Sequence, residues 1–149
     1  MAATRILKTA LLPYPAGHVF DVINDIEAYP QYMEGCVGAT ILLARDDLVE
    51  ARLALSRAGI TQSFATRNLL ERPTLIRMEL LEGPFRSWHG EWQFQALAMD
   101  ACKVSLDLQF EMDGRLISLA AGKLFEGVAV NLVDALCKRV QHLHGDSLP

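Results

Sequence analysis

Hydrophobic and polar residues alternate through most of the chain between residues 5 and 111, and a period of two residues is typical of β-strands. The clearest stretch is 87–96, where Trp88, Trp92 and Phe94 share one face and charged or amide side chains share the other. The segments predicted as strands, separated by Gly, Pro and Asp turn signals, are 5–11, 37–45, 48–57, 60–70, 75–81, 87–96 and 102–110. Because one face of such a strand is apolar and the other polar, we expect an antiparallel sheet with one buried face.

Two segments follow a helical period instead, with apolar residues three or four positions apart. Residues 16–24 predict a short helix after the first strand, and a second short helix is expected around Pro30. Residues 115–144 predict one long helix, in which Gly122 and Gly127 indicate either a kink or a close approach to the sheet. The apolar stripe predicted for this helix is Leu116, Leu119, Ala120, Leu124, Val128, Leu132, Leu136, Val140 and Leu143.

The order of these elements predicts an α+β fold in one domain covering residues 1–149. A seven-stranded antiparallel sheet with an apolar face must cover that face, and the C-terminal helix is the only predicted element that is long enough. Because sheets twist, we expect the sheet to curve around this helix, with the two short helices following the first strand. Such curvature leaves space between sheet and helices, where a ligand would lie.

Composition and charge narrow the function classes. Hydrophobic residues make up 51% of the 149 residues and charged residues 21%, as in globular proteins. The net charge of −4 argues weakly against nucleic-acid binding, and we expect no DNA partner. No apolar run approaches the roughly 18 residues of a membrane-spanning helix, and the first residues lack the apolar core of a signal peptide. We therefore expect a cytoplasmic protein.

The residue types that usually carry catalysis or bind metals are scattered along the chain. They are His18, His89, His142, His144, Cys36, Cys102 and Cys137. The three cysteines lack metal-ligand spacing, and their odd number favours a reducing compartment over a disulfide framework. We find no poised acid–base pair, so we expect no catalytic residue, no metal site and no required cofactor.

Several motifs occur in order over residues 9–139 and cover nearly the whole chain. They are Val19-Phe20-Asp21-Val22-Ile23-Asn24-Asp25, Tyr29-Pro30-Gln31-Tyr32, Gly35-Cys36, Ser56-Arg57-Ala58-Gly59-Ile60, Phe64-Ala65-Thr66-Arg67-Asn68, Leu81-Glu82-Gly83-Pro84-Phe85, Trp92-Gln93-Phe94 and Leu124-Phe125. On these motifs the chain resembles bacterial RatA-type proteins and the mitochondrial coenzyme Q-binding START-domain family, within the polyketide cyclase/dehydrase-like superfamily. The combination of the Tyr-Pro-Gln-Tyr and Gly-Pro-Phe motifs is the specific part of the resemblance.

The resemblance implies a helix-grip fold with a hydrophobic cavity. In the mitochondrial branch it implies coenzyme Q binding that supports respiration, and in the enterobacterial branch a toxin that hinders association of ribosomal subunits. Our leading hypothesis is a non-enzymatic carrier or chaperone for ubiquinone or a similar polyprenyl lipid, which the long helix or the 83–86 loop would open to admit. Transient contact with the inner membrane surface would accompany this role.

Two other functions follow from the same resemblance, because fold alone does not decide function. The alternative is a RatA-like toxin that binds the large ribosomal subunit and blocks subunit association. An enzyme that acts on cyclic polyketides is not expected, for want of acid–base residues.

Aromatic and methionine side chains on the inward faces are the candidates for the cavity wall, since planar rings stack on a quinone and aliphatic groups accommodate its tail. The candidates are Phe20, Tyr29, Tyr32, Met33, Phe64, Met78, Trp88, Trp92 and Phe94 from the strands and short helices, with Leu116, Leu119 and Phe125 from the long helix. Thr66 and Asn68 share the parity of Phe64 and are candidate hydrogen-bond partners for a quinone carbonyl. A well-filled core explains the same apolar residues without a ligand.

Arginines on consecutive predicted strands and turns bear on the alternative function. They are Arg52, Arg57, Arg67, Arg72, Arg77 and Arg86. Such a cluster could contact ribosomal RNA phosphates or anionic lipid headgroups. The interspersed glutamates at 50, 71, 79 and 82 favour the simpler interpretation, a solvated face of mixed charge.

Overall fold

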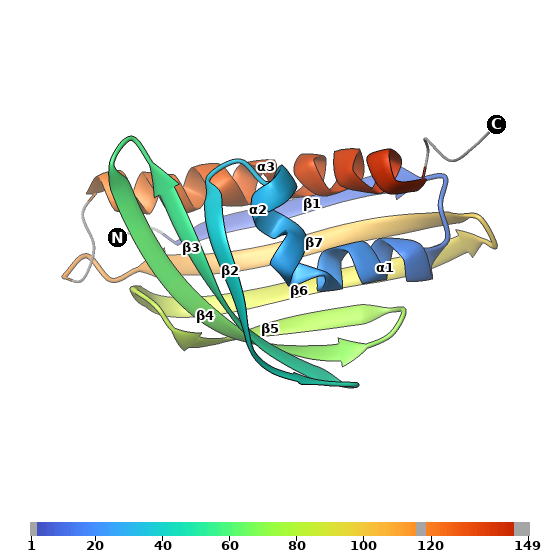
Figure 1. Cartoon of the computed structure of the whole chain (residues 1–149), viewed down its shortest axis with the longest axis horizontal. Helices are drawn as coiled ribbons and strands as arrows, with labels where there is room; N and C mark the ends of the chain where they lie inside the picture. The colour runs from blue at the N-terminus through green and yellow to red at the C-terminus, as the bar shows by residue number, and fades with distance from the viewer. Residues whose placement is uncertain (1–2, 116–118, 145–149) are drawn as a thin grey trace.

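The computed structural model describes residues 3–115 and 119–144, and Figure 1 shows a strongly curved sheet with one long helix running along its open side. The strands are β1 (Thr4–Leu12), β2 (Cys36–Arg45), β3 (Leu48–Arg57), β4 (Ile60–Glu71), β5 (Leu75–Glu82), β6 (Phe85–Ala98) and β7 (Ala101–Met112). The helices are α1 (Ala16–Asn24), the 3₁₀ helix η1 (Ile26–Ala28), α2 (Tyr29–Tyr32) and α3 (Leu119–His144). The predicted helix-grip architecture is confirmed, and each strand ends within two residues of its predicted bounds.

All seven strands form one antiparallel sheet in the order β1-β7-β6-β5-β4-β3-β2. The first two strands of the chain therefore lie at opposite edges of the sheet. Each ladder joins neighbours in sequence except that of β1 with β7, which pairs Thr4 with Phe110 and Leu12 with Cys102. This long-range ladder brings the beginning of the chain to the strand that precedes the C-terminal helix.

The ladder between β5 and β6 is short and marks where the two strands separate. It comprises four residue pairs, from Leu75 with Gln93 to Met78 with Gly90. At its end the indole nitrogen of Trp88 donates a hydrogen bond of 3.1 Å to the carbonyl of Met78. A buried backbone carbonyl normally needs such a partner, so the indole completes the ladder where backbone pairing stops.

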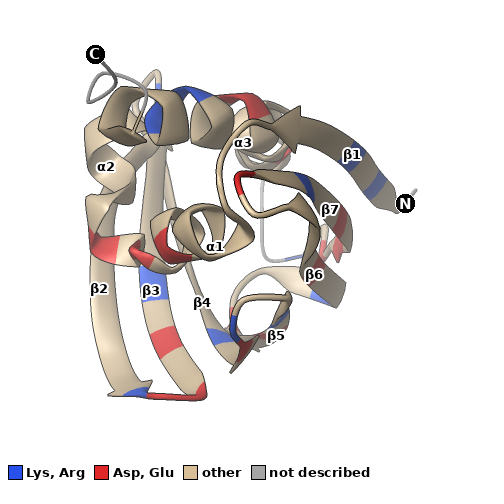
Figure 2. Cartoon of the chain, turned by 90° about the vertical axis from the view of Figure 1, so that its right-hand side faces the viewer, with Lys and Arg blue, Asp and Glu red and all other residues tan. Residues whose placement is uncertain are grey.

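The short helices lie inside the curve of the sheet, and Figure 2 shows α1 and α2 there with α3 above them. α1 contacts α3, β6 and β7. On its buried side Val19 is 0% exposed, and the ring of Phe20 lies 5.3 Å from that of Phe94 between their centroids. This helical face, predicted from the spacing of its apolar residues, thus fills one end of the concave side.

The long helix α3 begins later than predicted and buries a partly different face. Arg115 lies in a turn, with its backbone N–H donating to the Asp113 carboxylate at 3.0 Å. Leu119 is 80% exposed, and Leu116 lies outside the described residues. The residues buried on α3 are Ala121, Leu124, Phe125, Ala129, Val133, Leu136 and Val140. Small alanines on this face allow close approach to the neighbouring elements, and a count of large apolar residues does not detect them.

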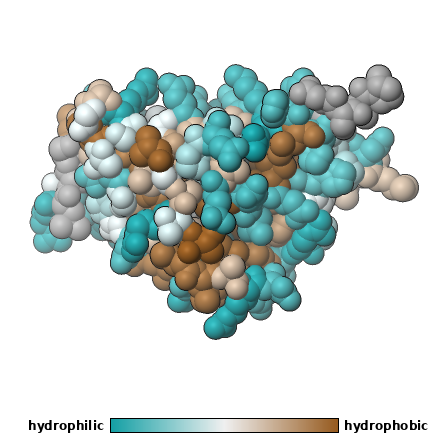
Figure 3. All heavy atoms as spheres, in the orientation of Figure 1, coloured by the Kyte–Doolittle hydropathy of each residue, from teal (hydrophilic) through white to brown (hydrophobic). Residues whose placement is uncertain are grey.

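Apolar side chains also occur on the outer surface, among polar ones, as Figure 3 shows for one face. The large ones that are exposed are Leu7, Leu11, Val37, Leu42, Leu81, Leu97, Met99, Leu119, Val130 and Leu143. They lie on both edge strands, on β5 and β6, in the β6–β7 turn and on α3 rather than on one element. In the part of the chain that is described, no helix is long and apolar enough to cross a bilayer.

Candidate ligand-binding cavity

An apolar cavity of about 90 Å³ lies between the concave face of the sheet, η1, the α2 region and α3. Nine of the side chains predicted for its wall line it: Tyr29, Met33, Phe64, Thr66, Asn68, Met78, Trp88, Trp92 and Phe125. The volume is smaller than the roughly 150 Å³ of an engineered cavity that accepts benzene. A ring-sized ligand therefore needs the wall to yield, and the flexible thioethers of Met33 and Met78 are the side chains best suited to do so.

Of the remaining predicted residues, Leu116 lies outside the described residues and the others do not line the cavity. Phe20 and Phe94 are 1% and 3% exposed and pack against each other under α1. Tyr32 packs its ring against Tyr29, with centroids 6.0 Å apart, and the guanidinium of Arg139 lies 5.1 Å from its ring centre. The prediction is wrong for Leu119, which is exposed at the start of α3. Side-chain parity indicates which face of a strand is inward, but not which inward residues border empty space.

Ten further residues line the cavity and were not predicted as wall residues. They are Ile26, Ala51, Leu53, Leu55, Phe85, Leu108, Phe110, Val128, Ala129 and Leu132. The sequence pattern indicates six of them as inward-facing. Ala51, Leu53 and Leu55 alternate on β3, and Val128, Ala129 and Leu132 continue from Phe125 at helical spacing. Eight of the ten are aliphatic, a class that the prediction from aromatic and methionine side chains leaves out, whereas Phe85 and Phe110 are aromatic and were not included.

A cluster of aromatic rings forms one side of the cavity. Phe85 lies at its centre, with ring centroids 4.9 Å from Phe125, 5.0 Å from Trp88 and 5.9 Å from Phe64. These rings meet edge to face, and Phe64 meets Phe125 in the same way at 5.4 Å. Edge-to-face pairs contribute roughly 0.5–1.5 kcal/mol each beyond burial. The cluster therefore gives the cavity one comparatively rigid side, whereas the methionines are the adaptable part of the wall.

One polar pair of side chains, Thr66 and Asn68 on β4, lies in the wall of the cavity. The hydroxyl of Thr66 donates a hydrogen bond of 3.0 Å to the side-chain oxygen of Asn68, and the two residues are 9% and 7% exposed. Among the described residues, the amide nitrogen of Asn68 donates no hydrogen bond, so it is free to donate to a group that enters the cavity. A buried amide normally finds a partner, so a hydrogen-bond acceptor on a ligand would fit at this point.

Tyr29 is the one ionisable side chain among the described residues that line the cavity. Its hydroxyl donates to the backbone carbonyl of Ile23. Burial, with a smaller effect of Tyr32, raises the pKa of Tyr29 well above its ordinary value. A phenol that stays neutral and is already hydrogen-bonded is a poor general acid or base. Of the histidines, His18 stacks on His144 with centroids 4.8 Å apart and neither lines the cavity.

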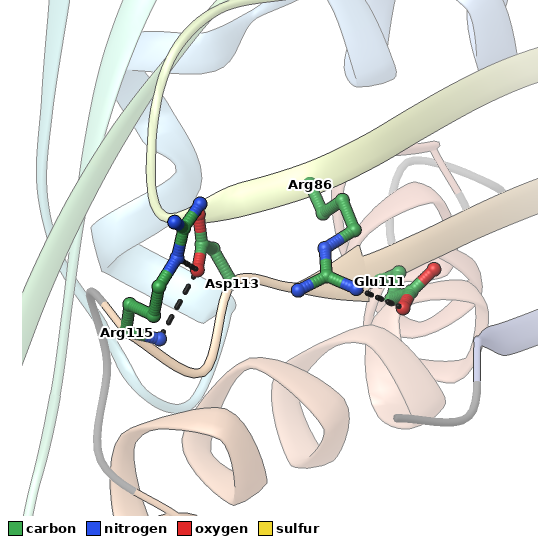
Figure 4. Close-up of polar contacts among 4 residues, drawn as sticks. All are labelled: Arg86, Glu111, Asp113 and Arg115. Atoms are coloured by element: carbon green, nitrogen blue, oxygen red, sulfur yellow. Dashed lines mark hydrogen bonds and ion pairs between the residues drawn. The ribbon is translucent and has the colours of Figure 1, made fainter.

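The six arginines noted on consecutive strands and turns are mostly paired with carboxylates, as the interpretation of a mixed-charge face predicts. The pairs are Arg52 with Glu82, Arg67 with Glu50 and Arg72 with Asp21, each at 2.8 Å, and Arg86 with Glu111 at 3.5 Å. Figure 4 shows the last of these beside the pair of Arg115 with Asp113, and Figure 2 shows basic and acidic residues interspersed along the strands. Within residues 3–115 and 119–144, Arg57 and Arg77 form no ion pair. The surface is therefore one of mixed charge rather than a basic patch.

Comparison with known proteins places this geometry in a family. Residues 12–137 match the sequence profile of the family described as polyketide cyclase/dehydrase and lipid transport. The ribosome association toxin RatA of Pseudomonas aeruginosa is 41% identical over 96% of this chain and 99% of its own length. The chain belongs to this family, among its RatA-type members.

Two further relatives bear on the function of the family. A ribosome association toxin RatA of Escherichia coli is 38% identical over 94% of this chain and 89% of its own length. A mitochondrial coenzyme Q-binding protein of Dictyostelium discoideum is 22% identical over 93% and 70%. The resemblance inferred from the motifs is thus confirmed at the level of the family.

Two solved structures show the same fold at low sequence identity. The Zhui aromatase/cyclase of a Streptomyces species has a TM-score of 0.78 at 18% identity, covering 98% of this chain and 99% of its own. A START superfamily protein of Mycobacterium smegmatis has a TM-score of 0.75 at 23% identity, covering 93% and 98%. The TM-scores show that the fold is shared. Because the sequence identities are low, the activity has to be argued from the residues of the site rather than from the fold.

Proposed function

We propose that this family member is a non-enzymatic binder of ubiquinone or a similar polyprenyl or otherwise hydrophobic ligand, which it holds in the cavity as a carrier or chaperone. The observation that carries the proposal is the cavity itself, apolar except for the Thr66–Asn68 pair and walled by aromatic rings. The family is described as one of lipid transport, and the coenzyme Q-binding relative suggests the ligand class.

The small volume of the cavity suits a ring or one isoprene unit rather than a whole polyprenyl lipid. The binding energy of such a small group is limited. Burying about 150 Å² of a ring contributes roughly 4 kcal/mol at 25 cal/mol per Å². A hydrogen bond from Asn68 to a carbonyl adds about 1 kcal/mol. Since the cost of association offsets much of this sum, useful affinity requires further carbon atoms packed beyond the ring. The wall must therefore open far enough to let a substituent leave the cavity.

The absence of catalysis is part of the proposal and is supported by the chemistry of the wall. Tyr29 is the ionisable residue found there, and its raised pKa keeps it neutral. The cyclisation of a polyketide requires proton transfer at the reacting carbons, for which a group with a pKa near neutrality is suited. The described wall offers packing and hydrogen bonds, which are the interactions of a binder.

A cavity-filling variant tests this proposal. Ala129 lines the cavity from α3, and Ala129→Met would fill much of its volume, whereas the neighbouring Val130 is 41% exposed and Val130→Met serves as the matched control. Organic extraction of the purified proteins followed by mass spectrometry should find quinone with the wild type and Val130→Met, and little with Ala129→Met. Equal amounts of quinone in all three, or none in any, would contradict the proposal.

Ribosome association is the second candidate function, and one observation favours it. Relatives that are 38% and 41% identical over nearly the whole chain bear the name ribosome association toxin. The six noted arginines give this candidate limited support, because most of them form ion pairs with carboxylates. Among the residues described, Arg57 and Arg77 are the exceptions. Binding to ribosomal RNA through so few charges would be weak and salt-sensitive.

Sedimentation with purified ribosomal subunits separates the two functions. If this candidate is right, the chain should sediment with the large subunit at low salt, and a double variant Arg57→Glu, Arg77→Glu should stay in the supernatant. Ala129→Met should sediment like the wild type, because the cavity is not involved. Failure of the wild type to sediment at low salt would remove this candidate and leave the ligand-binding proposal untouched.

A further inference from the structure

A second hollow, of about 240 Å³, lies on the surface between the first half of α3, the turn before β2 and the end of β3. We call it the outer hollow. Its wall includes Glu34 and Gly35 from the turn, Arg57 from β3, and Asn131 from α3. Unlike the cavity, it therefore carries charged groups. The ribosome-association candidate uses Arg57 from its wall, but neither proposed function uses the hollow as a binding site.

The outer hollow and the cavity share the same three supporting segments. In the turn before β2, Met33 lines the cavity while Gly35 lines the outer hollow. At the end of β3, Leu55 faces the cavity and Ser56 the outer hollow. On α3, Val128 lines both spaces. The two hollows are thus opposite sides of one thin wall.

In this wall Val128 lies against the backbone of Gly35. A Cβ atom added to Gly35 would stand 2.8 Å from Cγ2 of Val128, which is closer than van der Waals contact. Gly35 also has a φ of +91°, a conformation that side-chain-bearing residues rarely adopt. At this point the side chain of one valine, resting on bare backbone, separates the outer hollow from the cavity. A rotation of that side chain or a small shift of the turn would connect them.

The polar groups of the outer hollow are both donors and acceptors: Arg57 supplies a guanidinium and Glu34 a carboxylate, while the amide nitrogen of Asn131 already donates to the carbonyl of Gly127. Arg57 is fixed at the last position of β3, opposite Ile60, and forms no ion pair within the described part of the chain. The hydroxyl of Ser56 accepts a hydrogen bond of 3.1 Å from Thr61 and keeps its own hydrogen for another partner. A guanidinium carries five N–H groups and suits oxygen acceptors.

We propose that the outer hollow is the entrance to the cavity and the second polar end of one binding site. Val128 is the gate between the two parts, and Arg57 receives oxygen atoms on the outer end of the ligand. This inference rests on the proposed ligand-binding function and narrows the ligand class. The ligand is a ring-sized apolar body with hydrogen-bond acceptors at both ends, one directed to Asn68 and one to Arg57.

Arginine replacement tests the outer end of the site. The probes are a ubiquinone with one isoprene unit, which has oxygen atoms around its ring, and naphthalene, which has none. Arg57→Gln should lower the affinity for the quinone roughly tenfold, the value of one charged hydrogen bond, and change the affinity for naphthalene less than about twofold. Arg77→Gln is the matched control, because Arg77 is exposed on β5 and lies outside both hollows.

The outcomes distinguish this inference from the function on which it rests. A wild type that binds neither probe overturns both. A wild type that binds both probes, with Arg57→Gln affecting neither or both equally, overturns the role of Arg57 and leaves the cavity as a binding site. Arg57→Lys should retain part of the quinone affinity, because it keeps a donor at the same place.

Binding rates test the gate. Val128→Ala removes two methyl groups from the wall, and stopped-flow quenching of tryptophan fluorescence should show quinone association and dissociation both accelerated, by roughly three- to tenfold. Leu132→Ala is the matched control, because Leu132 lies one turn along α3 and lines the cavity but not the outer hollow. It should change the affinity without accelerating association. If Val128→Ala, folded as judged by circular dichroism, binds at the wild-type rate, entry does not pass Val128.

Discussion

Arg72 donates two hydrogen bonds of 2.8 Å to Asp21, one from Nε to Oδ1 and one from Nη2 to Oδ2. This two-bonded pair joins α1 to the turn between β4 and β5, across 51 residues of sequence. Its geometry matches the planar fork of guanidinium to the two oxygens of a carboxylate. Both side chains are more than half exposed, so solvent screening limits what the pair contributes.

We expect this pair to make a small, pH-dependent contribution to stability. The hydrogen bonds from Arg72, opposed by partial burial, lower the pKa of Asp21 below its ordinary value of 3.8. A carboxyl with a lowered pKa in the folded state stabilises the fold above pH 3.8, and this is lost as the pH falls through the folded-state pKa. Asp21→Asn should cost under about 1 kcal/mol at pH 7 in urea unfolding, and the cost should vanish near pH 2. An equal cost at both pH values would assign the effect to packing instead.

Gly35 and Gly59 form a matched pair for measuring the contact with Val128. Both have positive φ, +91° and +83°, but a Cβ on Gly59 would meet nothing within 4 Å. Gly59→Ala should therefore cost about 1 kcal/mol from backbone strain alone. Gly35→Ala should cost roughly 1–3 kcal/mol more, because it also overpacks Val128. Thermal unfolding of Gly35→Ala combined with Val128→Ala should recover that additional cost; no recovery would mean that the clash is relieved elsewhere.

The Thr66–Asn68 pair allows stability and binding to be separated. Asn68→Leu alone leaves the buried Thr66 hydroxyl without its acceptor and should cost about 1–3 kcal/mol. Thr66→Val together with Asn68→Leu removes both partners and should be close to neutral in stability. The double variant should nevertheless bind the one-isoprene ubiquinone more weakly, by isothermal titration calorimetry. Unchanged affinity in a stable double variant would show that the ligand does not use this end of the cavity.

The three cysteines should react slowly with alkylating reagents near neutral pH. Burial raises the pKa of the thiols of Cys36, Cys102 and Cys137, with the Cys137 thiol further affected by Asp134. A raised pKa lowers the fraction of reactive thiolate. Iodoacetamide labelling followed by intact mass should show Cys137 modified first, because it is only partly buried, and should accelerate as the pH rises above 9. Rapid labelling of all three at pH 7 in the folded protein would contradict these directions.

The sheet could be predicted from the sequence because its strands bury one face. Alternation on β6, with Trp88 and Trp92 inward, specifies both the strand and its orientation. The same rule helped to locate nine of the nineteen residues that line the cavity. It could not separate Trp92, which borders empty space, from Phe94 two residues later, which packs on Phe20. That difference depends on how α1 sits against the sheet, which parity does not describe.

The buried face of α3 was harder to predict. Helical periodicity is inexact, and small residues such as alanine contribute little to a hydrophobic pattern. Leu119 fits the predicted stripe but is exposed, whereas Ala129 lines the cavity. The outer hollow was not predicted for a different reason. It is formed where Gly35 meets Val128, 93 positions apart in sequence, and neither residue type suggests a polar site.

The pairing of β1 with β7 has a consequence for how the chain folds. During synthesis the strands β2 to β6 can pair with their sequence neighbours as they emerge. The strand β1 can pair only after β7 has been synthesised, because Thr4 pairs with Phe110. Ladders that join distant residues form slowly, since loop closure must precede the gain from contact. The backbone of the N-terminal strand thus stays unpaired until nearly the whole chain has left the ribosome. In that interval its exposed backbone is the natural place for a chaperone, or a second nascent chain, to attach.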